Sequence, residues 1–232
     1  MNDRSTRRRF LTCTLTSIGA VSVLPARAQT PGGTGNSASS GASRTPSVND
    51  GRPALVVLGD SLSAEYGLPR GSGWVALLQQ RLAAQGHNYR IVNASISGET
   101  TSGGVSRIDG LLKRQQPAIV IIELGGNDAL RGLDLAATRA NLLTLARRSR
   151  EIGARVLILG MQMPPNYGVA YGERFARIFD EVARETGSAL VPFFLEDIGE
   201  RLEYFQPDRI HPNESAQPLM LERVWPALQP LL

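Results

Sequence analysis

The residues best suited to chemistry stand at three places along the chain. Ser61 and Asn127 each follow a short apolar run, and His211 lies three residues after Asp208 near the C-terminal end. A serine hydroxyl is a weak nucleophile until a base removes its proton, and the base must be held in the right tautomer. His211 can be that base and Asp208 its orienting partner, because a D-x-x-H spacing lets both side chains come from one tight turn. The pattern predicts nucleophilic catalysis by Ser61.

Each motif has a plainer interpretation when it is taken alone. Gly-Asp-Ser at 59–61 is a common turn, and Gly-Gly-Asn-Asp at 125–128 suits a turn from strand to helix, because glycine and asparagine tolerate positive φ. Asp208 could merely cap a helix or a turn. Asp60 and Asp128 are rival acids, although their places beside the other motif residues suggest that they shape their own loops. The motifs become specific because they occur together and in order.

Short β-rich apolar runs alternate with longer helical patterns. The expected strands are 54–58, 89–93, 119–124, 155–160 and 189–191, and the expected helices are 74–85, 105–115, 135–151, 172–186 and 215–231, the last interrupted at Pro226. Right-handed crossovers between such elements give a three-layer α/β/α sandwich with a mostly parallel five-stranded sheet, of flavodoxin-like type. Ligands bind beyond the carboxyl ends of the strands in these sheets, and the polar motifs stand there.

The two histidines differ in their expected positions. His87 follows Gly86 between a helix and a strand, which places it at the amino edge of the sheet as scaffold. His211 is then the only available imidazole base, and a three-histidine zinc site is impossible. The chain also lacks a G-x-S-x-G elbow, a Walker A loop and a G-x-G-x-x-G motif. We therefore expect no metal and no cofactor.

Four sequence blocks resemble those of the SGNH, or GDSL, hydrolase family, from about residue 54 to the C-terminus. The eponymous Ser, Gly, Asn and His correspond to Ser61, Gly98, Asn127 and His211, and the family's acid corresponds to Asp208. The strings GDSLSAEYGL, NASISGETTSGG, ELGGNDALRG, MPPNYG and IHPNESAQP are similar to a bacterial periplasmic group of multifunctional acyl-CoA thioesterases, lysophospholipases and arylesterases. The resemblance implies a Ser-His-Asp triad, with the backbone amides of Ser61 and Gly98 and the side chain of Asn127 as oxyanion donors.

The resemblance also indicates where specificity arises and where this chain departs from the family. By resemblance, the loop after the fourth expected strand lines and gates the acyl pocket through Met163, Pro164, Pro165 and Tyr167. A stiff Pro-Pro connection with incidental methionines is the alternative. Glu65 stands where the family usually has a small residue, commonly glycine. This departure raises a question about substrate access and leaves the chemistry intact.

The N-terminal segment 1–28 predicts export. Several arginines precede an apolar stretch at 10–24, and Ala-Arg-Ala at 26–28 is an A-x-A cleavage site, as in a signal peptide. Thr-Arg-Arg-Arg-Phe-Leu at 6–11 resembles the twin-arginine export signal, with an ordinary Sec signal as the alternative. The apolar stretch is shorter than the roughly 20 residues of a spanning helix. We expect a periplasmic or secreted protein without a stable membrane anchor.

Removal of that segment would also change the composition. The 25 basic and 21 acidic residues become 20 and 20, because five arginines and one aspartate leave, so the whole-chain pI of 9.7 gives no support to a nucleic-acid partner. The only cysteine, Cys13, would leave too. Residues 29–52 are rich in Gly, Ser, Thr, Pro and Asn and predict a flexible linker. The remaining 53–232 predict one domain, which we expect to be monomeric because no long apolar surface stripe stands out.

These observations favour an exported serine esterase or thioesterase that acts on aryl esters, acyl thioesters or lysophospholipids through an acyl-enzyme. A polysaccharide deacetylase of the same family is the first alternative, and it would cleave acetylated sugars with little activity on longer acyl chains. A binding module that kept the fold and lost turnover is the second. The intact five-residue set argues against the second alternative.

Overall fold

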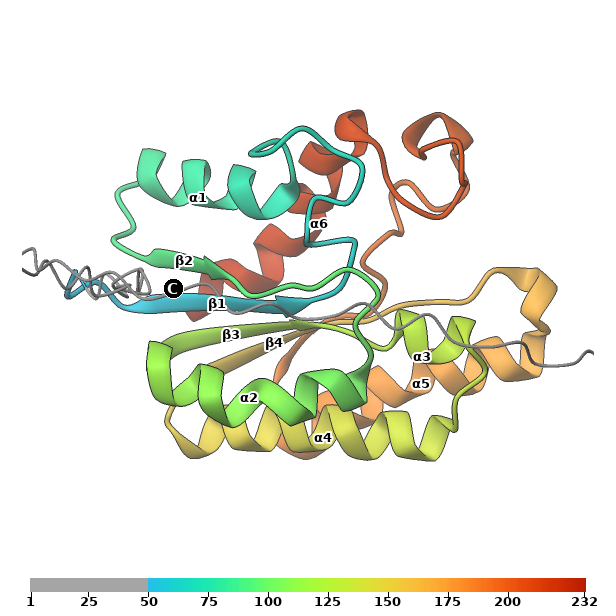
Figure 1. Cartoon of the computed structure of the whole chain (residues 1–232), viewed down its shortest axis with the longest axis horizontal. Helices are drawn as coiled ribbons and strands as arrows, with labels where there is room; N and C mark the ends of the chain where they lie inside the picture. Colours follow the sequence, from blue (N-terminus) through green and yellow to red (C-terminus); the bar gives the residue numbers. More distant parts are fainter. Residues whose placement is uncertain (1–49) are drawn as a thin grey trace, which may run out of the picture. The chain divides into compact units, whose positions relative to one another are not determined.

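A five-stranded parallel sheet organises the part of the chain that the structure describes, residues 50–232 (Figure 1). The structure is a computed structural model. The strand order is β2-β1-β3-β4-β5, and every neighbouring pair is parallel. The strands are β1 (Ala54–Gly59), β2 (Arg90–Asn93), β3 (Pro117–Glu123), β4 (Arg155–Leu159) and β5 (Ala189–Val191). The predicted sheet is confirmed, and all its strands run in one direction.

The central strands are buried on both faces of the sheet. β1 is buried along its whole length, and β3 is buried everywhere except at Ala118. Successive side chains of a strand point to opposite faces, so a strand that is apolar at every position needs a layer of helices on each side. Those layers are visible in Figure 1, where α1 and α6 cover one face and α2, α4 and α5 cover the other. The three-layer prediction is therefore confirmed.

The helices have the bounds α1 (Trp74–Ala84), α2 (Thr101–Gln115), α3 (Gly126–Leu130), α4 (Leu135–Glu151), α5 (Val169–Thr186) and α6 (Gln217–Leu228). Short 3₁₀ segments are η1 (Pro165–Tyr167), η2 (Leu202–Tyr204), η3 (Glu214–Ala216) and η4 (Gln229–Leu231). Several details differ from the prediction, which did not include α3 and began α5 three residues later. α2 begins four residues earlier than expected, because the Thr100 side chain accepts a hydrogen bond from the Gly103 N–H and caps the helix. Pro226 lies inside α6 and does not interrupt it.

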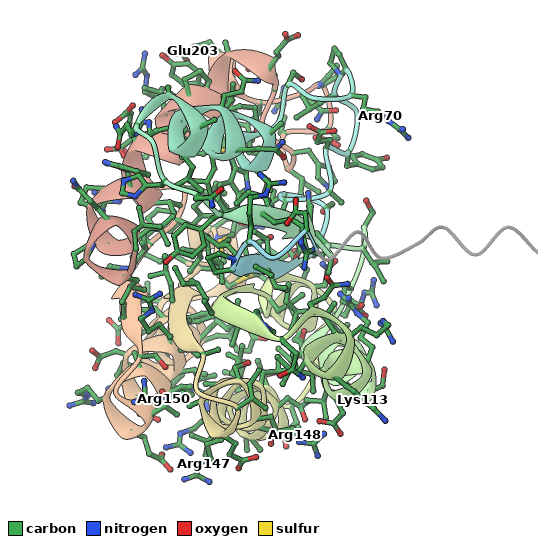
Figure 2. All side chains as sticks on the ribbon, turned by 90° about the vertical axis from the view of Figure 1, so that its left-hand side faces the viewer. Arg70, Lys113, Arg147, Arg148, Arg150 and Glu203 are labelled. Atoms are coloured by element: carbon green, nitrogen blue, oxygen red, sulfur yellow. The ribbon has the colours of Figure 1, made fainter. Side chains whose placement is uncertain are left out.

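Arginines on the outer helices carry much of the exposed charge, and several are paired. Figure 2 views the sheet from its amino edge and shows Arg147 and Arg148 pointing outward from the helical layer. Arg147 pairs with Glu185 at 2.6 Å and Arg148 with Asp109 at 2.7 Å. Exposed pairs of this kind contribute little to stability, about 0–1 kcal/mol. These partners balance part of the positive charge on this side of the domain.

The predicted signal peptide, 1–28, and most of the predicted linker, 29–52, lie outside the described residues. Within residues 50–232, no helix is long and apolar enough to cross a membrane. No group of three or more His, Cys, Asp or Glu in the same range is placed to hold a metal ion.

Candidate active site

Three polar side chains form a continuous hydrogen-bonded chain at the carboxyl edge of the sheet. Ser61 lies in the turn directly after β1, and its Oγ is 2.9 Å from His211 Nε2. The other ring nitrogen of His211, Nδ1, is 2.7 Å from Asp208 Oδ2. His211 and Asp208 come from the loop between η2 and η3, 150 residues from the serine in sequence. The structure thus brings together the three residues predicted to form a triad.

Asp208 organises its own turn as well as the imidazole. Its Oδ1 accepts hydrogen bonds from the backbone N–H groups of Ile210 at 2.9 Å and His211 at 3.0 Å, and Arg209 between them has a φ of 59°. Partial burial opposes ionisation, but these two N–H groups and the imidazole lower the pKa of Asp208 to about 2. The Asp208 carboxylate therefore stays charged at neutral pH and in mild acid. Asp208 both shapes the turn and faces the base.

The predicted oxyanion donors converge from three different strand ends. Ser61 follows β1, Gly98 lies in the turn after β2, and Asn127 occupies the first turn of α3, which follows β3. Gly98 has a φ of 77°, a conformation that L side chains rarely adopt, so the turn at this point favours glycine. Within residues 50–232, the backbone N–H groups of Ser61 and Gly98 donate no hydrogen bond to a protein atom. Both N–H groups are therefore available to a ligand.

The side-chain amide of Asn127 is fixed by one hydrogen bond to Asp60. Its Nδ2 donates to Asp60 Oδ2 at 2.8 Å, which leaves a second N–H on the same nitrogen. An asparagine side chain with one N–H fixed and the other free is a suitable donor to an oxyanion.

Replacement of Asn127 by alanine should lower kcat for ester hydrolysis by about 100- to 1,000-fold, as expected for the loss of one oxyanion donor. The KM should change much less, because the donor acts mainly in the transition state. Steady-state kinetics on one p-nitrophenyl ester measures both constants. A variant that keeps its kcat and raises only KM would remove Asn127 from the oxyanion hole.

Buried acids brace the loops around these donors. Asp128 is 2 % exposed, and its Oδ2 accepts a hydrogen bond from the Thr101 backbone N–H at 2.9 Å. The Thr101 hydroxyl also donates to Asp128, so the carboxylate ties the start of α2 to α3. Neither Asp60 nor Asp128 hydrogen-bonds to His211 in the described structure. Both acids therefore support the loops, which agrees with the interpretation from the sequence.

An aromatic side chain that the sequence analysis did not single out lies against the catalytic imidazole. The ring of Tyr66 is centred 4.4 Å from that of His211, and half of the tyrosine side chain is exposed. Gln206 links the two loops, since its backbone N–H donates to the His211 carbonyl at 2.8 Å and its side chain donates to the Tyr66 carbonyl at 2.8 Å. The only sequence feature that could have pointed to this contact is a tyrosine five residues after the nucleophile.

Glu65 adopts the backbone conformation that explains why glycine is common at this position. Its φ is 59°, in the left-handed region. Its carboxylate points to the following loop, where Oε1 accepts hydrogen bonds from the backbone N–H groups of Gly71 and Gly73, each at 3.0 Å. Gly73 is the residue that precedes α1. The Glu65 side chain therefore stabilises the loop between β1 and α1 through these hydrogen bonds.

Replacement of Glu65 by alanine should destabilise the domain by about 1 kcal/mol, or ~2–4 °C in Tm, because two backbone N–H groups lose their acceptor. Replacement by glutamine is the matched control, since its Oε1 can still accept both hydrogen bonds. Thermal unfolding followed by circular dichroism compares the two variants. Equal Tm values for the alanine and glutamine variants would show that these hydrogen bonds do not stabilise the domain.

The predicted substrate loop lies at the same sheet edge, after β4. Met163 is partly buried and packs on the core, Pro164 is exposed, and Tyr167 is 41 % exposed. Pro165 begins η1, and its side chain lies outside the described set. No hydrogen bond joins the described side chains of this loop to the triad. The lining role of these four residues remains a prediction.

Other features lie away from the triad. His87 faces Trp225, with ring centres 6.4 Å apart, and makes no contact with the catalytic groups. Surface cavities of about 300 and 460 Å³ lie beside α4, lined by residues such as Lys113 and Arg148, or Arg139 and Arg177. None of the residues that line these cavities belongs to the triad or to the oxyanion donors.

A serine, a histidine base and an aspartate at the carboxyl edge of a parallel α/β/α sheet define a serine hydrolase. The serine does not lie on a G-x-S-x-G elbow, so this is not the α/β-hydrolase arrangement. Residues 57–217 match the GDSL-like Lipase/Acylhydrolase family, and the chain belongs to this family. The resemblance stated from the sequence is confirmed, and the protein is an ester hydrolase of the SGNH class.

Relatives agree with this assignment over most of the domain. The chain is 54 % identical to esterase TesA of Pseudomonas aeruginosa, over 77 % of this chain and 89 % of that protein. It is 39 % identical to thioesterase 1/protease 1/lysophospholipase L1 of Escherichia coli K12, over 77 % of this chain and 84 % of that protein. The psychrotrophic esterase EstA of Pseudoalteromonas sp., crystallised with monoethylphosphonate as inhibitor, superposes with a TM-score of 0.73 at 38 % identity, covering 76 % of this chain and 97 % of that chain.

Proposed function

We propose that this protein is an exported serine esterase and thioesterase that acts on aryl esters, acyl thioesters and lysophospholipids. The observation that carries the proposal is the continuous chain from Ser61 Oγ to His211 Nε2 at 2.9 Å, and from His211 Nδ1 to Asp208 at 2.7 Å. Such a chain lets the serine attack a carbonyl carbon while its proton passes to the imidazole.

The reaction would proceed in two halves. In the first, His211 Nε2 takes the proton of Ser61, whose Oγ bonds to the carbonyl carbon, and the carbonyl oxygen becomes an oxyanion. The donors of Ser61, Gly98 and Asn127 stabilise that oxyanion. His211 then gives its proton to the leaving alcohol or thiol as the bond to that group breaks, which leaves an acyl-enzyme. In the second half, water gives a proton to His211 and attacks the acyl carbon. The bond from that carbon to Ser61 Oγ then breaks, His211 returns its proton to Ser61 Oγ, and the carboxylic acid leaves.

Apolar side chains around the site favour an acyl or aryl group as the part of the substrate that is bound. Tyr66 presents half of its surface beside the catalytic imidazole, and Tyr167 is exposed in the loop after β4. Aromatic and methionine side chains form adaptable apolar walls that suit such groups. The names of the relatives, esterase and thioesterase/lysophospholipase, point to the same substrates.

Export and a monomeric state complete the proposal. They rest on the N-terminal pattern of 1–28 and on the absence of a long apolar stripe from the sequence. Cell fractionation tests the first, where an enzyme retained in the cytoplasm would contradict export. Light scattering of the purified domain tests the second.

The experiment that tests the substrate class is hydrolysis of p-nitrophenyl esters from acetate to palmitate, together with matching acyl-CoA thioesters. We expect an optimum at acyl chains longer than acetate. Acetylated oligosaccharides form the comparison set, because activity confined to acetate and to these sugars would favour the polysaccharide deacetylase. Loss of all turnover in a folded protein would favour the binding module.

A further inference from the structure

A pair of carboxyl groups is buried beside the nucleophile. Asp60 directly precedes Ser61, and Glu123 is the last residue of β3. The strands place them together, since Gly59 of β1 is in register with Glu123. Glu123 is 1 % exposed and Asp60 is 3 % exposed. The mechanism above uses neither of them as acid, base or nucleophile.

Glu123 is surrounded by uncharged donors. Its Oε2 accepts hydrogen bonds from the Ser63 hydroxyl at 2.7 Å and from the Asp60 backbone N–H at 3.2 Å. Ser63 Oγ in turn accepts from Trp74 Nε1 at 3.2 Å. The carboxyl packs so closely on β1 that a Cβ at Gly59 would lie 2.7 Å from Glu123 Oε2, so only glycine fits there. In the described part of the chain, no arginine or lysine forms an ion pair with Glu123 or Asp60.

Asp60 accepts a hydrogen bond from one of the oxyanion donors. Its Oδ2 accepts the hydrogen bond from Asn127 at 2.8 Å, and its Oδ1 accepts from the Leu62 backbone N–H at 3.0 Å. The two acids are close neighbours, because the Asp60 backbone N–H itself donates to Glu123 Oε2. Two carboxylates have no proton to share, so a hydrogen bond between their side chains would require one neutral acid. Two buried negative charges side by side, with no cation paired to either, would also be strongly unfavourable.

We propose that Glu123 is a neutral acid whose O–H donates a hydrogen bond to the Asp60 carboxylate, and that this pair positions Asn127 and the turn that carries Ser61. The proposal deepens the proposed function, because it assigns a support for the same site. Glu123 and Asp60 are positioning residues, since neither touches the reacting atoms.

The surroundings decide which of the two acids holds the proton. Burial and the charge of Asp60 raise the pKa of Glu123 well above its ordinary value of about 4.5. Burial also raises the pKa of Asp60, but the Leu62 N–H, Glu123, the Asn127 amide and the nearby His211 all stabilise its charged form. The pair faces one further titratable group, His211 from the loop before η3. Ser63, Trp74 and Asn127, from the other surrounding elements, are uncharged.

The arrangement gives the site one buried negative charge in place of two. That single charge fixes one N–H of Asn127 and leaves the other free for the oxyanion. A second carboxylate would add repulsion against the oxyanion as it forms. A neutral acid can donate to Asp60 while its other oxygen accepts from Ser63, so no buried polar group is left unpaired.

The pH dependence of stability tests the shared proton without reference to activity. Glu123 binds its proton more tightly in the folded state, so the stability that this group contributes is fully present below its ordinary pKa of about 4.5 and is lost as the pH rises through its folded-state pKa. Glu123→Gln has no such proton to lose. We expect the unfolding constant of wild type, divided by that of Glu123→Gln, to rise about tenfold per pH unit above about pH 5 until the pH reaches the folded-state pKa of Glu123. A ratio that is independent of pH would overturn the proposal.

If Glu123→Gln does not fold, a ¹³C NMR pH titration of the glutamate side-chain carboxyls in the wild-type enzyme takes the place of the stability comparison. We expect one glutamate carboxyl to stay neutral well above the ordinary pKa of about 4.5. Titration of every glutamate below pH 5 would overturn the proposal. Since neither measurement uses turnover, failure of the positioning pair remains distinct from failure of the esterase assignment.

Kinetics test the positioning role. Asp60→Asn should lower kcat by about 10- to 100-fold with little change in KM, because Asn127 loses its charged acceptor while substrate binding remains. Glu123→Gln should lower kcat less than Asp60→Asn does, since its amide can still donate to Asp60. A greater loss in Glu123→Gln, or an effect on KM alone, would contradict the role of the pair.

Discussion

Replacement of Ser61 by alanine should lower kcat for p-nitrophenyl ester hydrolysis by about 10⁴- to 10⁶-fold. The loss is large because the variant has no oxygen nucleophile at 2.9 Å from His211 Nε2, so no acyl-enzyme can form. The residual rate would come from substrate binding and the remaining oxyanion donors. Steady-state rates and a test for an initial burst measure the effect, and the burst should disappear.

The matched control for this variant is Ser106→Ala. Ser106 is exposed on α2, and its hydroxyl only donates to the Gly103 carbonyl of its own helix. Its rates should equal those of wild type. Unchanged turnover in Ser61→Ala would refute the mechanism, and an equal loss in both variants would point to a fault in folding.

Replacement of His211 by alanine should produce a loss of similar size, about 10⁴- to 10⁶-fold in kcat, because the serine then has no base. A combined Ser61→Ala and His211→Ala variant should be no worse than either single variant, since the two residues act as a unit. Rates of the three variants on one ester measure this non-additivity. Losses that multiply in the double variant would show that the two residues act separately.

The other histidine of the chain provides the control for that experiment. His87→Ala removes an imidazole that faces Trp225 and contacts none of the catalytic groups. Its turnover should match that of wild type. A comparable loss in His87→Ala would contradict the assignment of His211 as the base.

The strands and the positions of the site residues followed from simple patterns. Apolar runs such as that of β3 are typical of strands buried on both faces of a sheet. Parallel pairing then places the carboxyl ends of these strands at one edge of the sheet. Ser61, Asn127 and His211 were therefore expected at the same edge although up to 150 residues separate them. The short helix α3 was missed, because five residues beginning with glycine carry no helical periodicity.

Tertiary contacts account for what the sequence left open. Glu65 looked like an obstacle to substrate, but its left-handed backbone turns the carboxylate onto the Gly71 and Gly73 amides. Glu123 passed unnoticed because one acid at the end of an apolar run resembles an ordinary strand terminus. Its burial beside Asp60 depends on the pairing of β1 with β3, which no local pattern reveals. The tilted contact between the rings of Tyr66 and His211 likewise joins two loops distant in sequence.

Covalent labelling with a fluorophosphonate tests the central claim most directly. The activated serine should attack phosphorus, and intact mass spectrometry should then show one adduct per chain, which peptide mapping assigns to Ser61. Ser61→Ala should remain unlabelled under the same conditions. An unlabelled wild-type protein, or an adduct on another residue that persists in Ser61→Ala, would contradict a mechanism based on Ser61.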